Sequence, residues 1–123
     1  MLYFLDTNIC IYFLKGTYPS IKECLLSHKP AFIKIPSLVK AENLKMIEDF
    51  LFPFNIVPFD DKASLIYGNL RCQLEKDGSP VGPNDMIIAA TVMACNGTLV
   101  TRNMDEFSRI DGLQIEDWSQ LRE

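Results

Sequence analysis

Short apolar runs alternate along the chain with longer segments whose apolar residues recur at helical spacing. The short runs suit strands better than helices, and we predict strands over residues 2–5, 32–35, 55–59, 98–101 and 113–115. The longer segments predict helices that begin near residues 7, 19, 37, 61 and 83, with one more helical turn over residues 105–107. Strands that alternate with helices form a parallel sheet covered on both faces. The pattern therefore predicts one α/β domain over residues 1–123, a three-layer α/β/α sandwich with a mostly parallel central sheet.

Two of these predicted helices have clear start signals and apolar patterns. One follows the N-capping residue Asp60, ends at Asp77-Gly78, and has a regular apolar stripe between them. The other begins at Pro83 and is apolar on almost every side. A helix of that kind is covered by neighbours on most sides, so we place it at the centre of the fold.

The segment after Ser37 does not fit one straight helix. At about 100° per residue, the apolar residues of 38–41 face one way, and those of 44–51 face about 160° away from them. One helix cannot bury both faces against one core. We therefore expect either a break in the helix or a missing helical segment near residues 43–44.

Composition and charge narrow the functional classes. Hydrophobic residues make up 48% of the chain and charged residues 23%, as in folded globular proteins, and 12 Lys and Arg against 16 Asp and Glu give a net charge of −4. Nucleic-acid-binding proteins usually have a basic face. Any proposal that this chain acts on nucleic acid therefore has to explain its net negative charge. No apolar stretch is long enough to span a membrane and the first residues lack the features of a signal peptide, so we expect a cytoplasmic protein.

Cysteine and histidine offer little chemistry. The four cysteines form no C-x-x-C pair, which argues against a zinc site and against a disulfide framework. The single histidine, His28, excludes a two-histidine nuclease, and it is also the only residue that could serve a Ser-His triad. Oxygen-bearing side chains are the remaining candidates.

Four oxygen-bearing side chains follow predicted strands or open predicted helices. They are Asp6, Glu42, Asp85 and Asn103. The carboxyl ends of parallel strands and the helix starts beyond them form the ligand crevice of such a sheet, so we expect the four to converge. Carboxylates that share a small site repel one another, and Mg²⁺ or Mn²⁺, which prefer oxygen ligands, remove that repulsion. A metal ion held there can activate water and screen the charge of a phosphodiester.

Each of these residues also has a purely structural interpretation. Asp6 can be a helix N-cap and Asp85 a partner of a helix dipole, and the other two can be ordinary surface and turn residues. Thr7 and Asn8 are capping residues first and supports of the site second. The metal-site hypothesis depends on the four occurring together, each beyond its own strand or at its own helix start.

Several stretches of the sequence resemble one protein family. The chain opens with FLDTNICIYFLK, continues with IPSLVKAE, and later contains GPNDMIIAA, LVTRNMDEF and, near its end, EDW. In this order and spacing the sequence resembles the PIN-domain ribonucleases, and among them the VapC toxins of bacterial toxin–antitoxin pairs. The resemblance extends over nearly the whole chain, and it implies an α/β/α fold and a metal-dependent endoribonuclease.

The resemblance also implies roles for individual residues. The three acids of the family match Asp6, Glu42 and Asp85, and its fourth position, often Asn in VapC toxins, matches Asn103. These residues would hold one or two Mg²⁺ or Mn²⁺ ions, with Asp6 and Asp85 as principal ligands and Glu42 completing the site or orienting the water. Asp105 follows Asn103 by two residues and is a further candidate for support.

Partners follow from the same resemblance. It implies an RNA substrate, transfer or ribosomal, a VapB-type antitoxin that neutralises the toxin, a homodimer, a toxin–antitoxin hetero-oligomer and no membrane partner. Arg102 or Arg109 could contact an RNA phosphate. VapC proteins typically continue from the second acid into a longer helical hairpin, and this chain lacks roughly a dozen residues of it, in agreement with the helical arithmetic above.

The sequence leaves two other classes of function open. One is a PIN-fold interaction module without catalysis, which Asn103 and the shortened segment after the second acid favour. The other is a metal-using α/β domain of different chemistry. A receiver would need a second acid near the first strand, and a D-x-D phosphohydrolase would need an acid where Asn8 stands. Mn²⁺ binding separates a metalloenzyme from a bare interaction module.

Overall fold

The computed structural model describes residues 1–41, 50 and 53–120, and a five-stranded sheet forms its centre. The strands, in chain order, are β1 (Tyr3–Leu5), β2 (Ile33–Pro36), β3 (Asn55–Val57), β4 (Thr98–Val100) and β5 (Gln114–Glu116). They lie side by side in the order β3-β2-β1-β4-β5, and every neighbouring pair is parallel. The predicted parallel sheet is confirmed.

The ends of the strands differ by a residue or two from the prediction. Phe32, predicted in a strand, belongs to a 3₁₀ helix over Pro30–Phe32 that leads into β2. β3 lies at the edge of the sheet and stops at Val57, and the following Pro58 has no N–H with which to continue a ladder.

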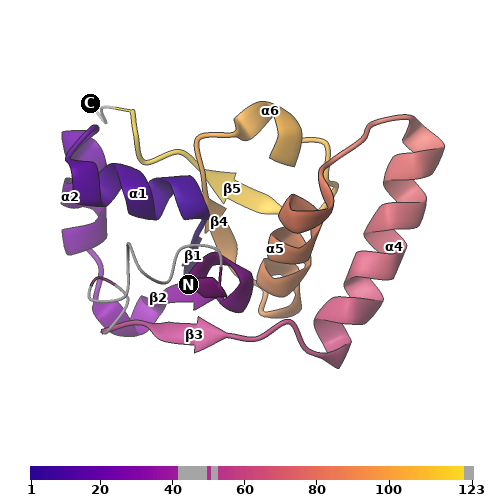
Figure 1. Ribbon diagram of the computed structural model, residues 1–123, viewed down its shortest axis with the longest axis horizontal. Coiled ribbons are helices and arrows are strands. Elements are labelled where there is room, and N and C mark those ends of the chain that lie inside the picture. The colour runs from indigo at the N-terminus through magenta and orange to yellow at the C-terminus, as the bar shows by residue number, and fades with distance from the viewer. Residues whose placement is uncertain (42–49, 51–52, 121–123) are drawn as a thin grey trace.

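Helices connect the strands and cover both faces of the sheet. They are α1 (Thr7–Lys15), α2 (Pro19–Leu26), α4 (Asp61–Asp77), α5 (Pro83–Ala94) and α6 (Met104–Phe107), and residues 37–41 are helical as well. In Figure 1, α1 and α2 lie to the left of the strands, and α5 and α4 lie to the right. Right-handed crossovers require this division, because the chain moves across the sheet in one direction from β1 to β3 and in the opposite direction to reach β4. The predicted three layers are confirmed.

The structure confirms the predicted ends of α4 and the predicted central position of α5. Asp60 caps α4 by accepting a hydrogen bond from the Ala63 N–H at 2.9 Å, and Gly78 ends the helix in the left-handed conformation. α5 is the central helix, and half of its twelve residues are buried. The change of helical phase predicted near residues 43–44 lies outside the described residues. No helix in the described part of the chain combines the length and hydrophobicity that a membrane crossing needs.

Candidate active site

The order of the strands creates a crevice at the carboxyl ends of β1 and β4. These strands are neighbours, but the connections that leave them run to opposite sides of the sheet. Such a reversal point is where open α/β sheets bind ligands. Asp6 follows β1 directly, and Asn103 follows β4 by three residues. The Asp6 N–H donates to the Val100 carbonyl at 3.2 Å, which holds the two strand ends together.

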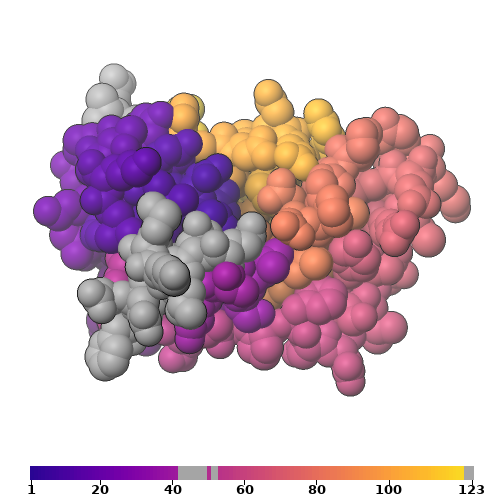
Figure 2. Space-filling model, in the orientation of Figure 1, coloured from indigo at the N-terminus to yellow at the C-terminus, as the bar shows by residue number. Residues whose placement is uncertain are grey.

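A small cavity of about 80 Å³ opens at this point, with room for a cation and several water molecules. Its polar lining comes from three segments far apart in the sequence: Asp6, Thr7, Asn8, Asp85 and Asn103. Ile88 and Phe107 form its apolar wall. In the space-filling view the indigo surface of α1 and the yellow-orange surface around α6 lie side by side (Figure 2).

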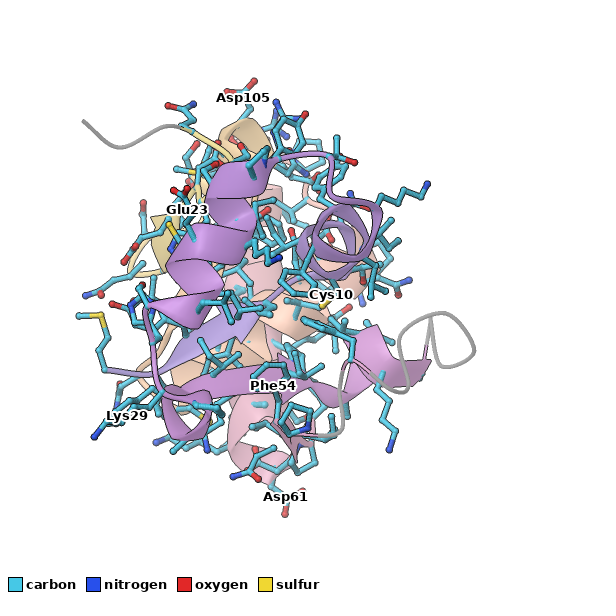
Figure 3. All side chains as sticks on the ribbon, turned by 90° about the vertical axis from the view of Figure 1, so that its left-hand side faces the viewer. Cys10, Glu23, Lys29, Phe54, Asp61 and Asp105 are labelled. Atoms are coloured by element: carbon cyan, nitrogen blue, oxygen red, sulfur yellow. The ribbon has the colours of Figure 1, made fainter. Side chains whose placement is uncertain are left out.

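Two of the predicted site residues are not among the described residues that line this cavity. Glu42 lies outside the described residues. Asp105 is exposed at the outer end of the molecule (Figure 3) and does not line the cavity. The next residue, Glu106, takes the supporting position that the sequence suggested for Asp105.

Asp6 is both a helix cap and a cavity residue. One of its carboxylate oxygens accepts a hydrogen bond from the Ile9 N–H at 2.9 Å and so caps α1. The side chain is only 7% exposed, and burial raises its pKa to about 6 against the opposing effect of hydrogen bonds from Thr101 and from the backbone of Ile9 and Asn8. An acid in this state favours a nearby positive charge, which would stabilise its ionised form.

Thr101 links two sides of the cavity. Its buried hydroxyl makes a hydrogen bond with the Asp6 carboxylate and accepts one from the Asn103 N–H at 3.0 Å. A single hydroxyl can do both because it is a donor and an acceptor at once. The residue therefore fixes the distance between the first acid and the loop after β4. Sequence reasoning did not single it out, although it lies in the LVTRN motif.

Glu106 connects the loop after β4 to the start of α5. Its two carboxylate oxygens accept hydrogen bonds at 2.8 Å, one from the Gly82 N–H and one from the Asn103 amide nitrogen. Burial opposes ionisation here, but these two bonds, an interaction with the Asp85 side chain and the charge of Arg109 hold the pKa of Glu106 below its usual value. Because the amide nitrogen of Asn103 is used in this bond, its carbonyl oxygen remains to serve a ligand.

The donor set of the cavity fits a hard divalent cation. Among the described residues no three His, Cys, Asp or Glu side chains gather into a metal cluster, so a cation here would also need amide or hydroxyl oxygens. Asp6 and Asp85 contribute two carboxylates, Asn103 an amide, and the buried Thr7 hydroxyl has no hydrogen-bond partner within the described structure. An orphaned buried hydroxyl and oxygen donors of this kind suit Mg²⁺ or Mn²⁺.

Asp117 adds negative charge near the cavity. Its carboxylate contributes to the raised pKa of Asp6 through charge repulsion. It accepts hydrogen bonds from both the backbone N–H and the hydroxyl of Ser119. The EDW motif contains this residue, but the sequence alone gave no sign that Asp117 comes close enough to Asp6 to affect its pKa.

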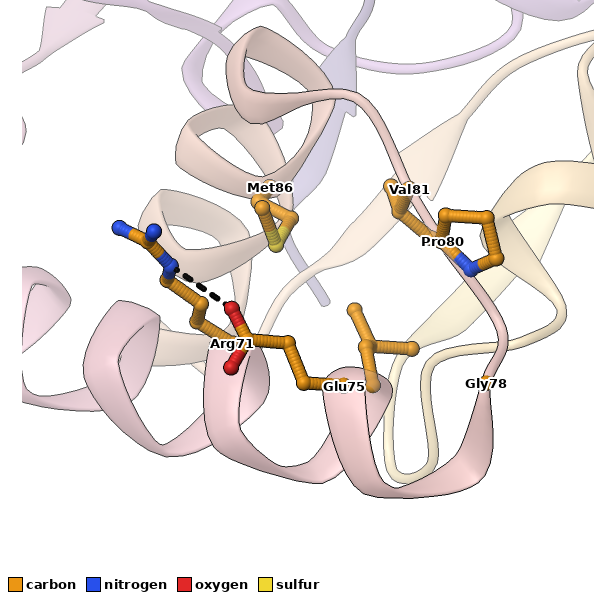
Figure 4. Close-up of a pocket in the computed structure, with 7 residues that line it drawn as sticks. Arg71, Glu75, Gly78, Pro80, Val81 and Met86 are labelled. Atoms are coloured by element: carbon orange, nitrogen blue, oxygen red, sulfur yellow. Dashed lines mark hydrogen bonds and ion pairs between the residues drawn. The ribbon is translucent and has the colours of Figure 1, made fainter.

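A larger cavity of about 380 Å³ lies elsewhere, between α4 and the segment leading into α5 (Figure 4). Leu74, Val81 and Met86 give it an apolar lining, and the Arg71–Glu75 ion pair of 3.2 Å stands at its rim. The only carboxylate among its lining residues is already paired. Donor chemistry, rather than size, therefore favours the smaller cavity as the active site.

Comparisons with known proteins show which family the chain is similar to. Residues 25–113 match the PIN domain. The chain is 38% identical to Ribonuclease VapC2 of Rickettsia felis over 134 residues, which covers 98% of this chain and 100% of the relative. It is 33% identical to the tRNA(fMet)-specific endonuclease VapC of Salmonella typhimurium over 128 residues, covering 94% of this chain and 97% of that relative.

A solved structure shares the fold as well. The chain resembles a protein in the crystal structure of VapBC2 from Rickettsia felis bound to a DNA fragment from their promoter, with a TM-score of 0.85 and 36% sequence identity. The match covers 96% of this chain and 99% of that one.

Proposed function

The chain belongs to the PIN-domain family, with the VapC ribonucleases as its relatives, and from this premise we propose that it is a metal-dependent endoribonuclease toxin. The observation that supports this most is the cavity itself. Side chains from the junction of β1 and α1, the start of α5 and the loop after β4 meet there, and their polar atoms include two carboxylates and an amide. A divalent metal ion that assists the hydrolysis of RNA would be held by this kind of donor set.

Asp6, Asp85 and Asn103 would hold Mg²⁺ or Mn²⁺, with Thr7 as a nearby hydroxyl donor, Asn8 as a further support and Glu42 as the third acid implied by the family resemblance. When bound, the metal would act as a Lewis acid that lowers the pKa of a water molecule and screens the charge of the phosphodiester. One or two ions can be accommodated by acids and amides of this number.

The surrounding residues prepare the site for this reaction. Thr101 holds the Asp6 carboxylate and favours its ionised form through a hydrogen bond. Glu106 holds the Asn103 amide nitrogen, so the amide presents its oxygen rather than its nitrogen to a cation. Ile88 and Phe107 keep water from one side of the cavity. The acidic net charge of the chain is thus partly a property of the active site.

The relatives suggest the partners. The Salmonella typhimurium protein is named a tRNA(fMet)-specific endonuclease, so we propose a transfer RNA as the substrate class. The Rickettsia felis structure is a VapBC2 complex, so we propose that a VapB-type antitoxin neutralises this chain in a hetero-oligomer. A homodimer within that assembly and a cytoplasmic location complete the proposal.

We also propose that this chain lacks a segment after Glu42 that its relatives have. The Rickettsia felis match extends over 134 positions and 100% of that relative, whereas 98% of 123 residues is about 121, so about 13 positions have no residue of this chain. The Salmonella typhimurium match leaves a similar difference, since 94% of 123 is about 116 against 128 positions. We propose that the gap falls near residues 43–44, where the helical phase changes.

Cleavage of a defined RNA tests the function. The antitoxin-free chain is incubated with formylmethionine transfer RNA and with total RNA, in Mg²⁺, in Mn²⁺ and in EDTA, and the new RNA ends are sequenced. We expect cleavage at discrete positions that EDTA abolishes and Asp85→Asn removes. Asp77→Asn, an exposed acid at the end of α4, is the matched control and should cleave as the unaltered chain does. A folded chain that cuts no RNA in either metal would support the interaction module instead.

A further inference from the structure

Arg102 is held in a fixed position at the edge of the candidate active site. It lies one residue before Asn103, and its side chain is exposed. Its guanidinium carbon lies 4.6 Å from the centre of the Tyr18 ring and 5.9 Å from that of Tyr12. The two tyrosine rings pack edge to face at 5.1 Å and 85°, so they form one aromatic support. Cation–π contacts of this length restrain a side chain that is otherwise flexible.

A hydrogen bond fixes the orientation of the same guanidinium. Its Nε donates to the Ser119 hydroxyl at 3.0 Å, and that hydroxyl donates in turn to Asp117. The Asp117 carboxylate is therefore engaged by Ser119 rather than by the arginine itself. Within the described part of the chain, Nε is the only guanidinium nitrogen of Arg102 with a hydrogen-bond partner. Its two Nη groups remain for an external acceptor, and an arginine binds phosphate best through two such donors.

Other arginines are used differently. Arg109 donates from Nη1 to the Pro80 carbonyl at 2.8 Å, which ties down the loop before α5, and it contributes to the low pKa of Glu106. Arg71 pairs with Glu75 on α4, beside the other cavity. Of the two phosphate contacts considered from the sequence, the structure therefore favours Arg102.

We propose that Arg102 binds a backbone phosphate of the RNA next to the one that is cleaved, and so positions the strand over the acidic cavity. This inference rests on the proposed ribonuclease function. An acidic site repels RNA, and a preorganised cation beside it supplies the local attraction that the net charge of −4 does not. Arg102 is in this view a positioning residue, while metal binding belongs to the neighbouring acids and amide.

Steady-state cleavage of formylmethionine transfer RNA by four variants tests the inference, with thermal melting as the check on folding. Arg102→Gln should raise KM about ten-fold and change kcat much less, and its KM should depend less on salt, by about 0.7 to 0.9 in log–log slope. Arg102→Lys keeps the charge without the planar group and should fall between. Tyr18→Leu removes the aromatic face beneath the guanidinium and should raise KM in the same direction as Arg102→Gln. Arg71→Gln is the matched control and should cause no change.

Several outcomes would overturn the inference while leaving the ribonuclease function in place. One is cleavage by Arg102→Gln with the KM and salt dependence of the unaltered chain. Another is a weaker complex with the antitoxin and unchanged RNA kinetics, which would assign Arg102 to the protein partner. A loss of kcat alone would make it part of the chemical step. If the unaltered chain cuts no RNA, the proposed function itself fails, and this result is distinct from the others.

Discussion

Replacing Asp6 by Asn should make the metal-free protein more stable at neutral pH. The ordinary pKa of this carboxyl is 3.8, and burial raises it to about 6 in the folded chain. Between these values the folded state binds more protons than the unfolded state, so the free energy of unfolding falls as pH rises through this range and stays lower above it. Asn cannot ionise, yet its side-chain oxygen can still accept the Ile9 N–H bond that caps α1.

The size of the effect follows from the two pKa values. The raised pKa of Asp6 lowers the free energy of unfolding by about 1 kcal/mol at pH 4.5 and by about 3 kcal/mol at pH 7.5, compared with a side chain that does not titrate. Asp6→Asn should therefore stabilise the chain by roughly these amounts, as measured by urea unfolding in EDTA at both pH values. Asp60→Asn alters the exposed cap of α4 and serves as the control, without a comparable gain at higher pH. A variant that is no more stable than the unaltered chain at pH 7.5, or equally stabilised at both pH values, would refute this reasoning.

Three further predictions concern the same site and its framework. Cleavage activity should fall as pH drops below about 6, because Asp6 then holds a proton; a pH–rate profile of kcat/KM checks this. Thr101→Val removes the hydroxyl that favours the ionised carboxylate, so the lower limb of that profile should move to higher pH, and an unmoved limb would count against the bond. Gly97→Ala would place a Cβ 2.5 Å from the Phe4 ring and should destabilise the fold by about 1–3 kcal/mol, whereas Gly68→Ala meets no atom within 4 Å and should be neutral or stabilising in thermal melts.

Much of the fold could be predicted because the capping residues and apolar patterns in the sequence agree with the helix ends and buried positions in the structure. Asp60 and Gly78 bound α4 as expected, and the largely apolar sequence of α5 matches its central position. The strand order could not be read from the sequence, since hydrophobic runs identify strands but not which neighbour each one pairs with. The reversal between β1 and β4, which forms the crevice, is visible only in three dimensions.

The candidate site, like the fold, could be predicted from the sequence only in part. Asp6 and Asp85 could be found because each stands beside a clear helix start, where its residue type is informative. Asp105 and Glu106 are adjacent acids in one short helix, and nothing in the sequence says which of them faces Asn103. The fold decides this, because only Glu106 reaches Gly82 at the start of α5.

Titration of Mn²⁺ into the antitoxin-free chain by calorimetry tests the central claim most directly, since it asks whether the cavity at the ends of β1 and β4 binds a divalent cation. At pH 7.5 we expect saturable binding that weakens at least ten-fold in Asp85→Asn and is unchanged in Asp77→Asn. Because the metal displaces the proton of Asp6, affinity should also fall below about pH 6. No heat of binding from the folded chain, or equal binding by all three proteins, would contradict the assignment of this cavity as the metal site.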